Sequence, residues 1–553
     1  MSTKKTEKER LEKDKELFSS LKTKRQEQIE TYWKFAIEYV MPLLNVWGEE
    51  TWDDNRYDTT ATESAEMTGD GMFGNMISPH THWVAYRTGR DELNDDPEFA
   101  KYLKKREKAL YEELQRSNFY EVMPEGITIC VAMATSSCFI DHDLKKGAAV
   151  LSIRHPWEVY ITQDRYERVN RVIRYFPLTA EQAANEYEDH KKFSIDLQQA
   201  VEDNPQNTFW FCELIEYRED RDKSKVDKLN MPIASRHWED GGDVYLREDG
   251  YITWPIPVWR YSLRTGSAYG FGPSFVAKPK ILTANQIKKD LLKANHKAVD
   301  PPFQAPKDLR GRVNLNPGGG TWLENANEYV KEMPSMSNLA AGYTELEKEQ
   351  ESIKRTYKTN HFLMLLDDEM KQGTTAREIF ERKAEKTTVI GSTLGKFMSE
   401  WLIPILERID QIGVDAGRIP QVPEELFFKM KEKYGDLGRG IQFEFMGPLA
   451  QAQKQLVDTQ GIVQSLDASS IIISAKPDTI DNLNLDEAIK DIWRTYGQAE
   501  NLRSDEEVEN IRAQRAQLEQ MRERLAQAEQ MSKQLPALSK APEAGSLLEQ
   551  VMP

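Results

Sequence analysis

Residues 372–413 read QGTTAREIFERKAEKTTVIGSTLGKFMSEWLIPILERIDQIG. The pair of threonines supplies an N-cap, and Glu378 follows at the spacing of a capping box. Pro404 lies inside the helical pattern and predicts a kink near Trp401. A threonine-and-charge loop that leads into a long kinked helix is a mechanical element and not an enzyme motif. The apolar residues that recur at helical spacing are Ile379, Phe380, Val389, Ile390, Leu394, Phe397, Trp401, Leu402, Ile405 and Ile409.

Composition narrows the class of protein around this helix. A chain of 553 residues is too long for one ordinary core and predicts several domains or an extended subunit. Its formal net charge of −17 argues against tight binding to nucleic acid, so any contact with DNA should be weak or sliding. No apolar run reaches the ~20 residues needed to span a bilayer. The charged N-terminus lacks the apolar core of a signal peptide, and we expect a soluble, cytoplasmic protein.

Three cysteines, Cys130, Cys138 and Cys212, have no CxxC spacing and cannot all pair. This pattern favours a reducing compartment and argues against a zinc site.

The coarse secondary-structure pattern predicts an α+β chain that is mainly helical. Helices are expected at 1–46, 59–77, 97–120 and 120–145, the last being apolar and buried. Short β-branched and aromatic runs between 148 and 259 predict a β-rich region with a helical insertion at 178–203.

The remainder of the chain reads as helices separated by turn-rich segments. Helices are expected at 277–299 and 343–360, with a Pro- and Gly-rich segment at 301–340 and a loop at 361–372. In 504–535 the apolar residues are seven apart but sparse, which favours an amphipathic helix that packs on copies of itself. The tail after residue 536 is predicted to be disordered.

The sequence contains no recognisable catalytic motif. GSTLGK at 391–396 lacks the Ser or Thr that completes a phosphate-binding loop, and neither HExxH nor GxSxG occurs. Asp141-His142-Asp143 can be read as metal ligands, but three consecutive side chains diverge on any regular element, so a solvated turn is favoured. Asp367-Asp368-Glu369 can be read as the acidic metal site of a nuclease, but a solvated or lumen-facing loop is favoured. A metal-dependent nuclease or phosphoesterase therefore stays open as the alternative.

Several segments resemble, in the same order along the chain, the head-to-tail connecting (portal) proteins of short-tailed bacteriophages. The resemblance covers roughly residues 25–460, and the collinear order of individually weak motifs makes it specific. One departure is the Thr-Thr pair at 374–375, where many relatives have Thr-Ala. The segments are YVMP at 39–42, YDTTA at 57–61 leading through 78–79 to Trp83, AYGFGP at 268–273, VDPP at 299–302 with NPGGG at 316–320, GTTARE at 373–378 and GPLAQAQ at 447–453.

The resemblance implies a portal-type subunit in a dodecameric ring at one capsid vertex, with DNA passing through an axial channel. It also implies a division of the chain into subdomains. These are a β-rich wing at 1–276, stem helix 1 at 277–300, the clip at 301–342, stem helix 2 at 343–360, a tunnel loop at 361–373, the long kinked wing helix at 374–419, a crown at 420–503, a C-terminal barrel helix at 504–535 and a disordered tail at 536–553.

The same resemblance suggests which residues meet DNA and partner proteins. The lysine-rich helix 277–299 is either an ordinary solvated face or a basic belt near DNA. The candidates are Asp367, Asp368, Glu369, Lys371 and Gln372 in the tunnel loop; Lys280, Lys288, Lys289 and Lys293 in the stem belt; and Lys307, Arg310 and Arg312 in the clip.

We expect no catalytic residue, no metal and no cofactor. The implied partners are other copies of the chain, double-stranded DNA bound weakly and without sequence preference, the major capsid and scaffolding proteins, the terminase large subunit and tail adaptor proteins, but no membrane. The implied location is the virion, after assembly in the host cytoplasm. Another ring protein of the head–tail junction is a further alternative.

Overall fold

The structure is a computed structural model of the 553-residue chain. The residues that it describes are 7–42, 56–305 except 95, 144, 146, 220 and 226, the positions 307, 310, 311, 313, 314, 322 and 330–332, and then 339–359, 393–434, 441–446, 486, 489 and 505–538. The chain divides into two compact units, residues 1–453 and 454–553.

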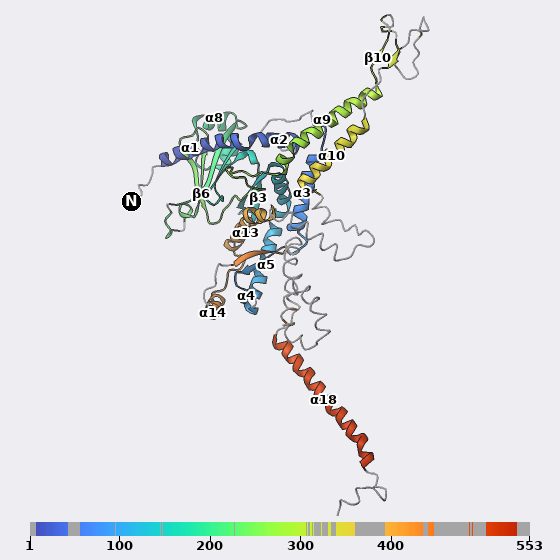
Figure 1. The fold of residues 1–553 in the computed structure, drawn as a ribbon. Coiled ribbons are helices and arrows are strands. Elements are labelled where there is room, and N and C mark those ends of the chain that lie inside the picture. Colours follow the sequence, from blue (N-terminus) through green and yellow to red (C-terminus); the bar gives the residue numbers. More distant parts are fainter. Residues whose placement is uncertain are drawn as a thin grey trace, which may run out of the picture. The chain divides into compact units, whose positions relative to one another are not determined.

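The first unit mixes helices and antiparallel sheets, so the predicted α+β class is confirmed (Figure 1). Its largest sheet is a five-stranded meander in which each strand pairs antiparallel with the next along the chain. This is the β-rich region that the alternating apolar runs predicted. The strands are β4 (Val159–Gln163), β5 (Val169–Thr179), β6 (Thr208–Tyr217), β7 (Ile233–Glu239) and β8 (Tyr245–Tyr251).

Helices cover both faces of this sheet. α1 (Glu7–Arg25) packs its apolar residues on one face, where Phe18 contacts the rings of Tyr160 and Tyr175. On the other face lie α7 (Ala180–Glu186) and α8 (Ile195–Asp203), which form the predicted helical insertion. Since successive side chains of a strand point to opposite faces, each strand contributes to more than one apolar cluster.

A row of charged and titratable residues crosses the same sheet, with the buried Glu213 and His237 at its centre. Arg174 lies opposite Glu213, Glu213 opposite His237, and His237 opposite Arg247 on consecutive strands. Ser235 donates a hydrogen bond to Glu213 Oε1 at 3.1 Å, and Glu213 lies 3.4 Å from His237 Nε2. Both members of the Glu213–His237 pair are almost fully buried, so this pair has a large electrostatic effect on folding.

Glu213 should make the stability of the protein sensitive to acid. Burial raises the pKa of this carboxyl, but His237, Arg174 and Arg154 outweigh it and lower the pKa from 4.5 to about 2. Because the folded pKa is below the unfolded one, the stabilisation is complete above pH 4.5 and is lost as the pH falls toward 2. It is worth on the order of 3 kcal/mol. Urea unfolding between pH 6 and pH 2 should show a shallower acid loss for Glu213→Gln than for the wild type. An unchanged acid slope in Glu213→Gln, or an equal flattening in the exposed control Glu202→Gln, would contradict this assignment.

The predicted buried helix at 120–145 is wrong in its second half. α6 (Phe119–Met133) covers only the first half of this range. β2 (Thr135–Asp143) follows as the middle strand of a three-stranded sheet with β3 (Ala148–Arg154) and β9 (Val258–Arg260). Ala134 between them has φ +60°, which ends the helix. Small and apolar residues in a row fit a buried strand as well as a buried helix, so the periodicity could not separate the two.

The other helices of this unit agree broadly with the predicted ones. The predicted helix at 1–46 consists of α1, a π-helical turn (Gln26–Glu30) and α2 (Thr31–Tyr39). α3 (Thr60–Met76) and α5 (Pro97–Arg116) occupy the predicted ranges. A two-stranded sheet joins β1 (Val84–Thr88) to β12 (Ile441–Phe445), and α14 (Glu424–Tyr434) precedes β12.

The long helix of 372–413 is described from Thr393 onward. It changes from α to π geometry at Phe397–Leu402 and continues as α13 (Ile403–Asp415). Where a kink is predicted near Trp401, the structure has a π turn that ends two residues before Pro404, whose ring cannot fit the α-helical hydrogen-bond pattern.

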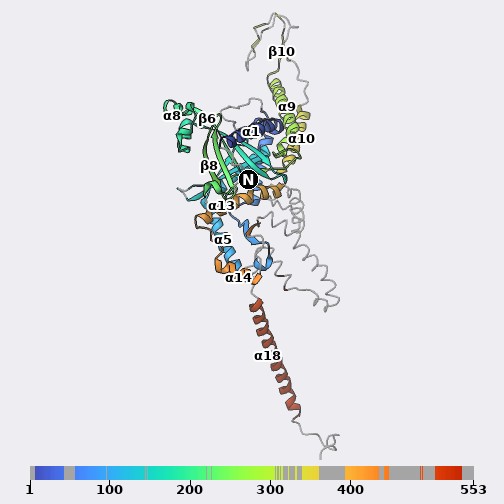
Figure 2. The same ribbon diagram turned by 90° about the vertical axis from the view of Figure 1, so that its left-hand side faces the viewer.

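Two further helices form an antiparallel hairpin. α9 (Pro273–Val299) begins four residues before the predicted 277 and ends before Asp300 as expected, and α10 (Leu339–Tyr357) returns beside it. Their far ends lead into a short ladder of β10 (Phe303–Gln304) and β11 (Lys331–Glu332), which Figures 1 and 2 show at the tip. We call α9, α10 and this ladder the hairpin.

The second unit contains α18 (Asp505–Leu538), close to the predicted 504–535. Leu518 and Met521 are exposed on it. Within the described part of the chain, no helix is both long enough and apolar enough to cross a membrane.

Candidate functional site

The end of the hairpin nearest the core, which we call the hairpin root, brings together two of the sequence segments singled out above. Along the hairpin, Lys280 Nζ donates to Thr356 Oγ1 at 3.2 Å and Asn295 Nδ2 donates to Tyr343 OH at 2.5 Å. Gly342 lies against Leu291, where a Cβ would come within 2.7 Å of Leu291 Cδ2. The two helices therefore pack closely along their length.

The YDTTA segment fastens the start of α3 to both hairpin helices. Asn285 Oδ1 of α9 accepts the backbone N–H groups of Tyr57 and Asp58 at 2.6 and 3.2 Å. Asp58 in turn accepts Gln350 Nε2 of α10 at 2.6 Å and the N–H of Thr60 at 3.1 Å. Asp58 thus accepts the first backbone N–H of α3 and also bridges α3 to the hairpin.

The AYGFGP segment wraps around the end of α6 before it enters α9. The backbone N–H of Tyr261 donates to Ala134 O at 3.0 Å, and the N–H of Gly270 donates to Thr135 Oγ1 at 3.0 Å. A Cβ on Gly270 would lie 1.8 Å from Ala134 O, and one on Gly272 would lie 2.9 Å from Ala134 Cβ. The two glycines of this segment are required by close backbone approach, not by turn geometry.

A chain of hydroxyl groups closes the hairpin root. Ser274 Oγ donates to Val131 O at 3.2 Å, and Tyr357 OH donates to Ser274 Oγ at 2.9 Å. Thr68 Oγ1 of α3 donates to Tyr357 O at 3.2 Å. Burial raises the pKa of the Tyr357 hydroxyl, so it remains a proton donor throughout the working pH range.

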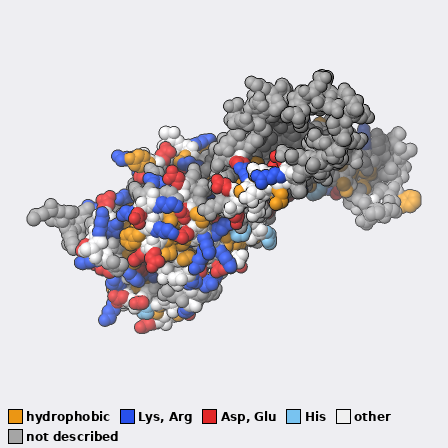
Figure 3. Space-filling view, turned by 90° about the horizontal axis from the view of Figure 1, so that it is seen from below, with side chains coloured by type: hydrophobic (Ala, Val, Ile, Leu, Met, Phe, Trp, Pro, Cys, Tyr) orange, Lys and Arg blue, Asp and Glu red, His pale blue; other side chains and the backbone are white. Residues whose placement is uncertain are grey.

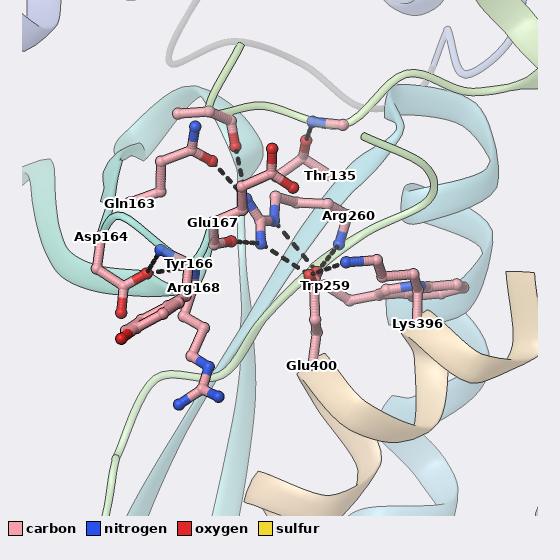
Figure 4. A network of polar contacts seen from close by, with 12 residues as sticks. Thr135, Gln163, Asp164, Tyr166, Glu167, Arg168, Trp259, Arg260, Lys396 and Glu400 are labelled. Atoms are coloured by element: carbon pink, nitrogen blue, oxygen red, sulfur yellow. Dashed lines mark hydrogen bonds and ion pairs between the residues drawn. The ribbon is translucent and has the colours of Figure 1, made fainter. Parts of the chain in front are cut away.

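Arg260 connects the hairpin root to the π turn (Figure 4). Its guanidinium is almost fully buried and forms a two-pronged pair with Glu400, with Nε–Oε2 at 3.1 Å and Nη2–Oε1 at 2.7 Å. The other N–H groups donate to Gln163 Oε1 at 3.1 Å, to Glu167 O at 2.6 Å and to Ala268 O at 3.3 Å. All five donors of the side chain have acceptors, as a buried arginine requires.

The four lysines of the predicted stem belt do not lie on one face of α9. At 100° per residue, Lys289 and Lys293 are neighbours, whereas Lys280 and Lys288 point to other sides. Lys280 turns toward α10, and Lys289 lies over the ring of Tyr57, 5.3 Å from its centroid. Lys288 is half-buried and Lys293 is exposed. Two of the four are therefore engaged within the subunit.

The predicted clip and tunnel-loop residues are described only in part. Lys307 and Arg310 are exposed near the tip of the hairpin, as is Trp322, at 92%. Arg312 lies outside the described residues, and so do Asp367, Asp368, Glu369, Lys371 and Gln372.

The alternative metal site at 141–143 lies at the end of β2. Asp141 Oδ1 accepts the N–H of His142, and Asp143 Oδ1 accepts the N–H of Lys145, both at 2.8 Å. Within the described ranges, no cluster of three or more His, Cys, Asp or Glu side chains has metal-binding geometry.

The three cysteines are free and buried. Burial raises the pKa of the Cys130 and Cys212 thiols well above the usual value and that of Cys138 to about 12, so none is a reactive thiolate.

Sequence reasoning missed the residues that hold the hairpin root together. Arg260 ends the apolar strand β9, and a charged residue at the end of a buried apolar run is a signal of a buried ion pair. Asn285 and Gln350 gave no signal, because a single amide on a helix is ordinarily a solvated side chain.

The sequence is similar to known proteins along most of its length. The chain matches the family model "Bacteriophage head to tail connecting protein" over residues 12–502. It is 27% identical over 489 residues to the probable portal protein of Bordetella phage BPP-1, covering 85% of this chain and 84% of the relative. It is 25% identical over 533 residues to the portal protein of Salmonella phage epsilon15, covering 92% of this chain and 91% of the relative.

Proposed function

The chain belongs to the family of bacteriophage head-to-tail connecting proteins and is a phage portal protein, and we propose that twelve copies form a ring whose axial channel carries DNA. Proteins of this family are structural components of the phage particle that join the capsid to the tail. The ring would sit at one capsid vertex, where DNA enters during packaging and leaves during ejection.

The hairpin root is the structural observation that best supports this proposal. Segments 57–61 and 268–273 are distant in the sequence, yet both hold the hairpin where it leaves the core. A rigidly rooted, projecting hairpin suits a subunit whose stem must keep one angle in a closed ring. In this proposal α9 and α10 are the stem, residues 301–342 the clip, residues 1–276 with the long helix the wing, 420–503 the crown and 504–535 the barrel.

Contacts with DNA are proposed to be weak. Phosphate binding depends on lysine and arginine side chains, and the net charge of −17 disfavours a tight complex. On the face in Figure 3, acidic and basic side chains are interspersed over the described surface, so this face offers DNA no broad basic region. Of the four predicted belt lysines, Lys288 and Lys293 are the two to which no contact inside the subunit is assigned above, and they are proposed to meet DNA. Many weak contacts let DNA slide without a deep energy minimum.

The tip of the hairpin is proposed to dock the terminase large subunit and then the tail adaptor proteins. Trp322 is the most exposed aromatic side chain at the tip that the structure describes, and tryptophan and arginine are the residues most enriched at interface hot spots. Arg310 and Lys307 are exposed in the same segment. We further propose that the wing and crown meet the major capsid and scaffolding proteins, and that assembly takes place in the host cytoplasm.

No catalytic role is proposed for the chain. The ATP-driven motor would be a separate terminase, and the acidic residues of 367–369 would repel phosphates instead of holding a metal. This proposal and the nuclease alternative differ in whether metal-dependent cleavage of DNA depends on Asp367.

The tunnel loop at 361–373 supplies the experiment for this function. Lys371→Glu, or deletion of 367–371, should leave ring assembly intact and impair DNA packaging or retention, because this loop is proposed to line the narrowest part of the channel. The charge-matched control Lys191→Glu, on an exposed 3-10 turn of the wing, should package normally. Particle yield and packaged DNA per particle are the measurements.

Two results would contradict the proposed role of the loop. Equal loss of assembly and packaging in the loop variants would assign 361–373 to the subunit interior. Normal packaging in the deletion variant would exclude the loop as a DNA contact.

A further inference from the structure

The π turn at Phe397–Leu402 holds one more residue than an α-helical turn would. Its signature is the backbone N–H of Ile403, which bonds Met398 O, five residues back. The N–H of residue 404 is missing because this residue is proline, so Glu400 O cannot accept the α-helical bond. The sequence thus provides a reason for an irregularity here, but it does not fix which residue is the extra one.

Buried contacts on one side of the helix select the position of the π turn. Phe397 and Trp401 both contact the ring of Trp259, at 4.9 and 5.4 Å between centroids. Gly126 makes room for Trp401, because a Cβ there would lie 2.4 Å from Trp401 Cη2. Ser399 is exposed on the opposite side of the turn. The helix therefore packs against the core with its aromatic side chains. The extra residue can be removed by deleting the solvent-exposed Ser399 on the opposite side.

Glu400 is the polar contact that fixes the register of the turn. Its carboxylate accepts the two-pronged bond of Arg260, the backbone N–H of Arg260 at 3.2 Å and Lys396 Nζ at 3.2 Å (Figure 4). If the helix shifted by one residue, Glu400 would rotate by about 100° and leave Arg260. The ion pair and the shifted register are mutually exclusive.

We propose that the Arg260–Glu400 pair is a latch on a one-residue register shift of this helix. While the pair is formed, the extra residue stays in the π turn at Phe397–Leu402. When the pair breaks, the extra residue moves along the helix toward Thr393. The turn 393–396 then rotates relative to α13. Arg260 also holds Glu167 O and Ala268 O, and Ala268 lies shortly before α9 begins. The latch therefore couples the register of the long helix to the β4–β5 turn and the hairpin root. This inference goes beyond the channel function and does not depend on it.

Amide hydrogen exchange of the full-length protein tests the latch. In Arg260→Met, exchange at 393–403 should accelerate by about tenfold or more, since the extra residue is free to move along the helix. Adding a deletion of Ser399 removes that residue, so exchange in the double variant should return to within about twofold of the wild type. The matched control is Arg236→Met, which breaks another buried arginine pair, with Asp14, and should leave 393–403 unchanged.

The Ser399 deletion separates the latch from a loss of stability alone. If Arg260 merely stabilises the core, the deletion adds a second defect and exchange at 393–403 rises further, which would overturn the proposal. The deletion in the wild-type background should fold and protect 393–403 at least as well as the wild type; failure of this single variant to fold, or faster exchange in it, would also overturn the proposal. Unchanged exchange in Arg260→Met would do the same.

Discussion

Replacing Gly270 with alanine is expected to prevent the hairpin root from forming. The new Cβ would lie 1.8 Å from Ala134 O and 3.1 Å from the backbone nitrogen of Tyr261, and neither neighbour is a flexible side chain. Relief of this overlap requires the backbone to move at the end of α6, where Ala134 already has a positive φ. The free energy of unfolding should fall by about 3 kcal/mol or more.

A helical glycine without close neighbours is the matched control for Gly270→Ala. Gly74 in α3 has no atom within 4 Å of its would-be Cβ. Gly74→Ala should therefore leave stability unchanged or raise it by about 0.5–1 kcal/mol. Urea unfolding followed by circular dichroism measures both variants. Equal stability of Gly270→Ala and Gly74→Ala would show that the close approach at Ala134 is not as described.

Replacing Arg260 with methionine should have the second large effect. The variant leaves the mostly buried carboxylate of Glu400 without its two-pronged partner and frees the acceptors on Gln163, Glu167 and Ala268. Removing one partner of a buried ion pair lowers the free energy of unfolding by about 3–5 kcal/mol. Unfolding of the purified protein in urea measures this loss.

A double-mutant cycle tests whether that loss comes from the pair itself. Arg260→Met with Glu400→Met removes both charges, so the double variant should recover part of the stability lost in Arg260→Met. Strictly additive losses in the double variant would mean that Arg260 and Glu400 do not interact in the way that their distances indicate.

The strands and the amphipathic helices were predictable because their composition and spacing are local signals. The strands of the five-stranded sheet are short β-branched and aromatic runs between turn residues, and α5 and the two hairpin helices repeat apolar residues at helical spacing. The irregularity near Pro404 was also predictable from the local sequence, since proline lacks the N–H group that an α-helix needs at that position.

The boundary between α6 and β2 was not predictable for a physical reason. Residues 120–143 are apolar or small almost throughout, so no period distinguishes a helix from a strand. What ends the helix is tertiary: the backbone N–H groups of Tyr261 and Gly270, more than a hundred residues away, donate to Ala134 O and Thr135 Oγ1. A contact between such distant segments cannot be predicted from the local sequence around Ala134.

The stem lysines illustrate a second limit of sequence reasoning. Composition correctly placed them on one helix but could not tell which of them serve the subunit itself. Lys289 lies over Tyr57 and Lys280 donates to Thr356, contacts that depend on where α3 and α10 pack. Motif order, by contrast, identified the family, because collinear segments need no knowledge of the packing.

The ring is the central claim, and the mass and shape of the purified full-length protein test it most directly. Native mass spectrometry combined with negative-stain imaging under capsid-assembly conditions should show a closed ring of twelve copies with a central hole. A stable monomer at micromolar concentration and physiological salt, with no ring under those conditions, would contradict it.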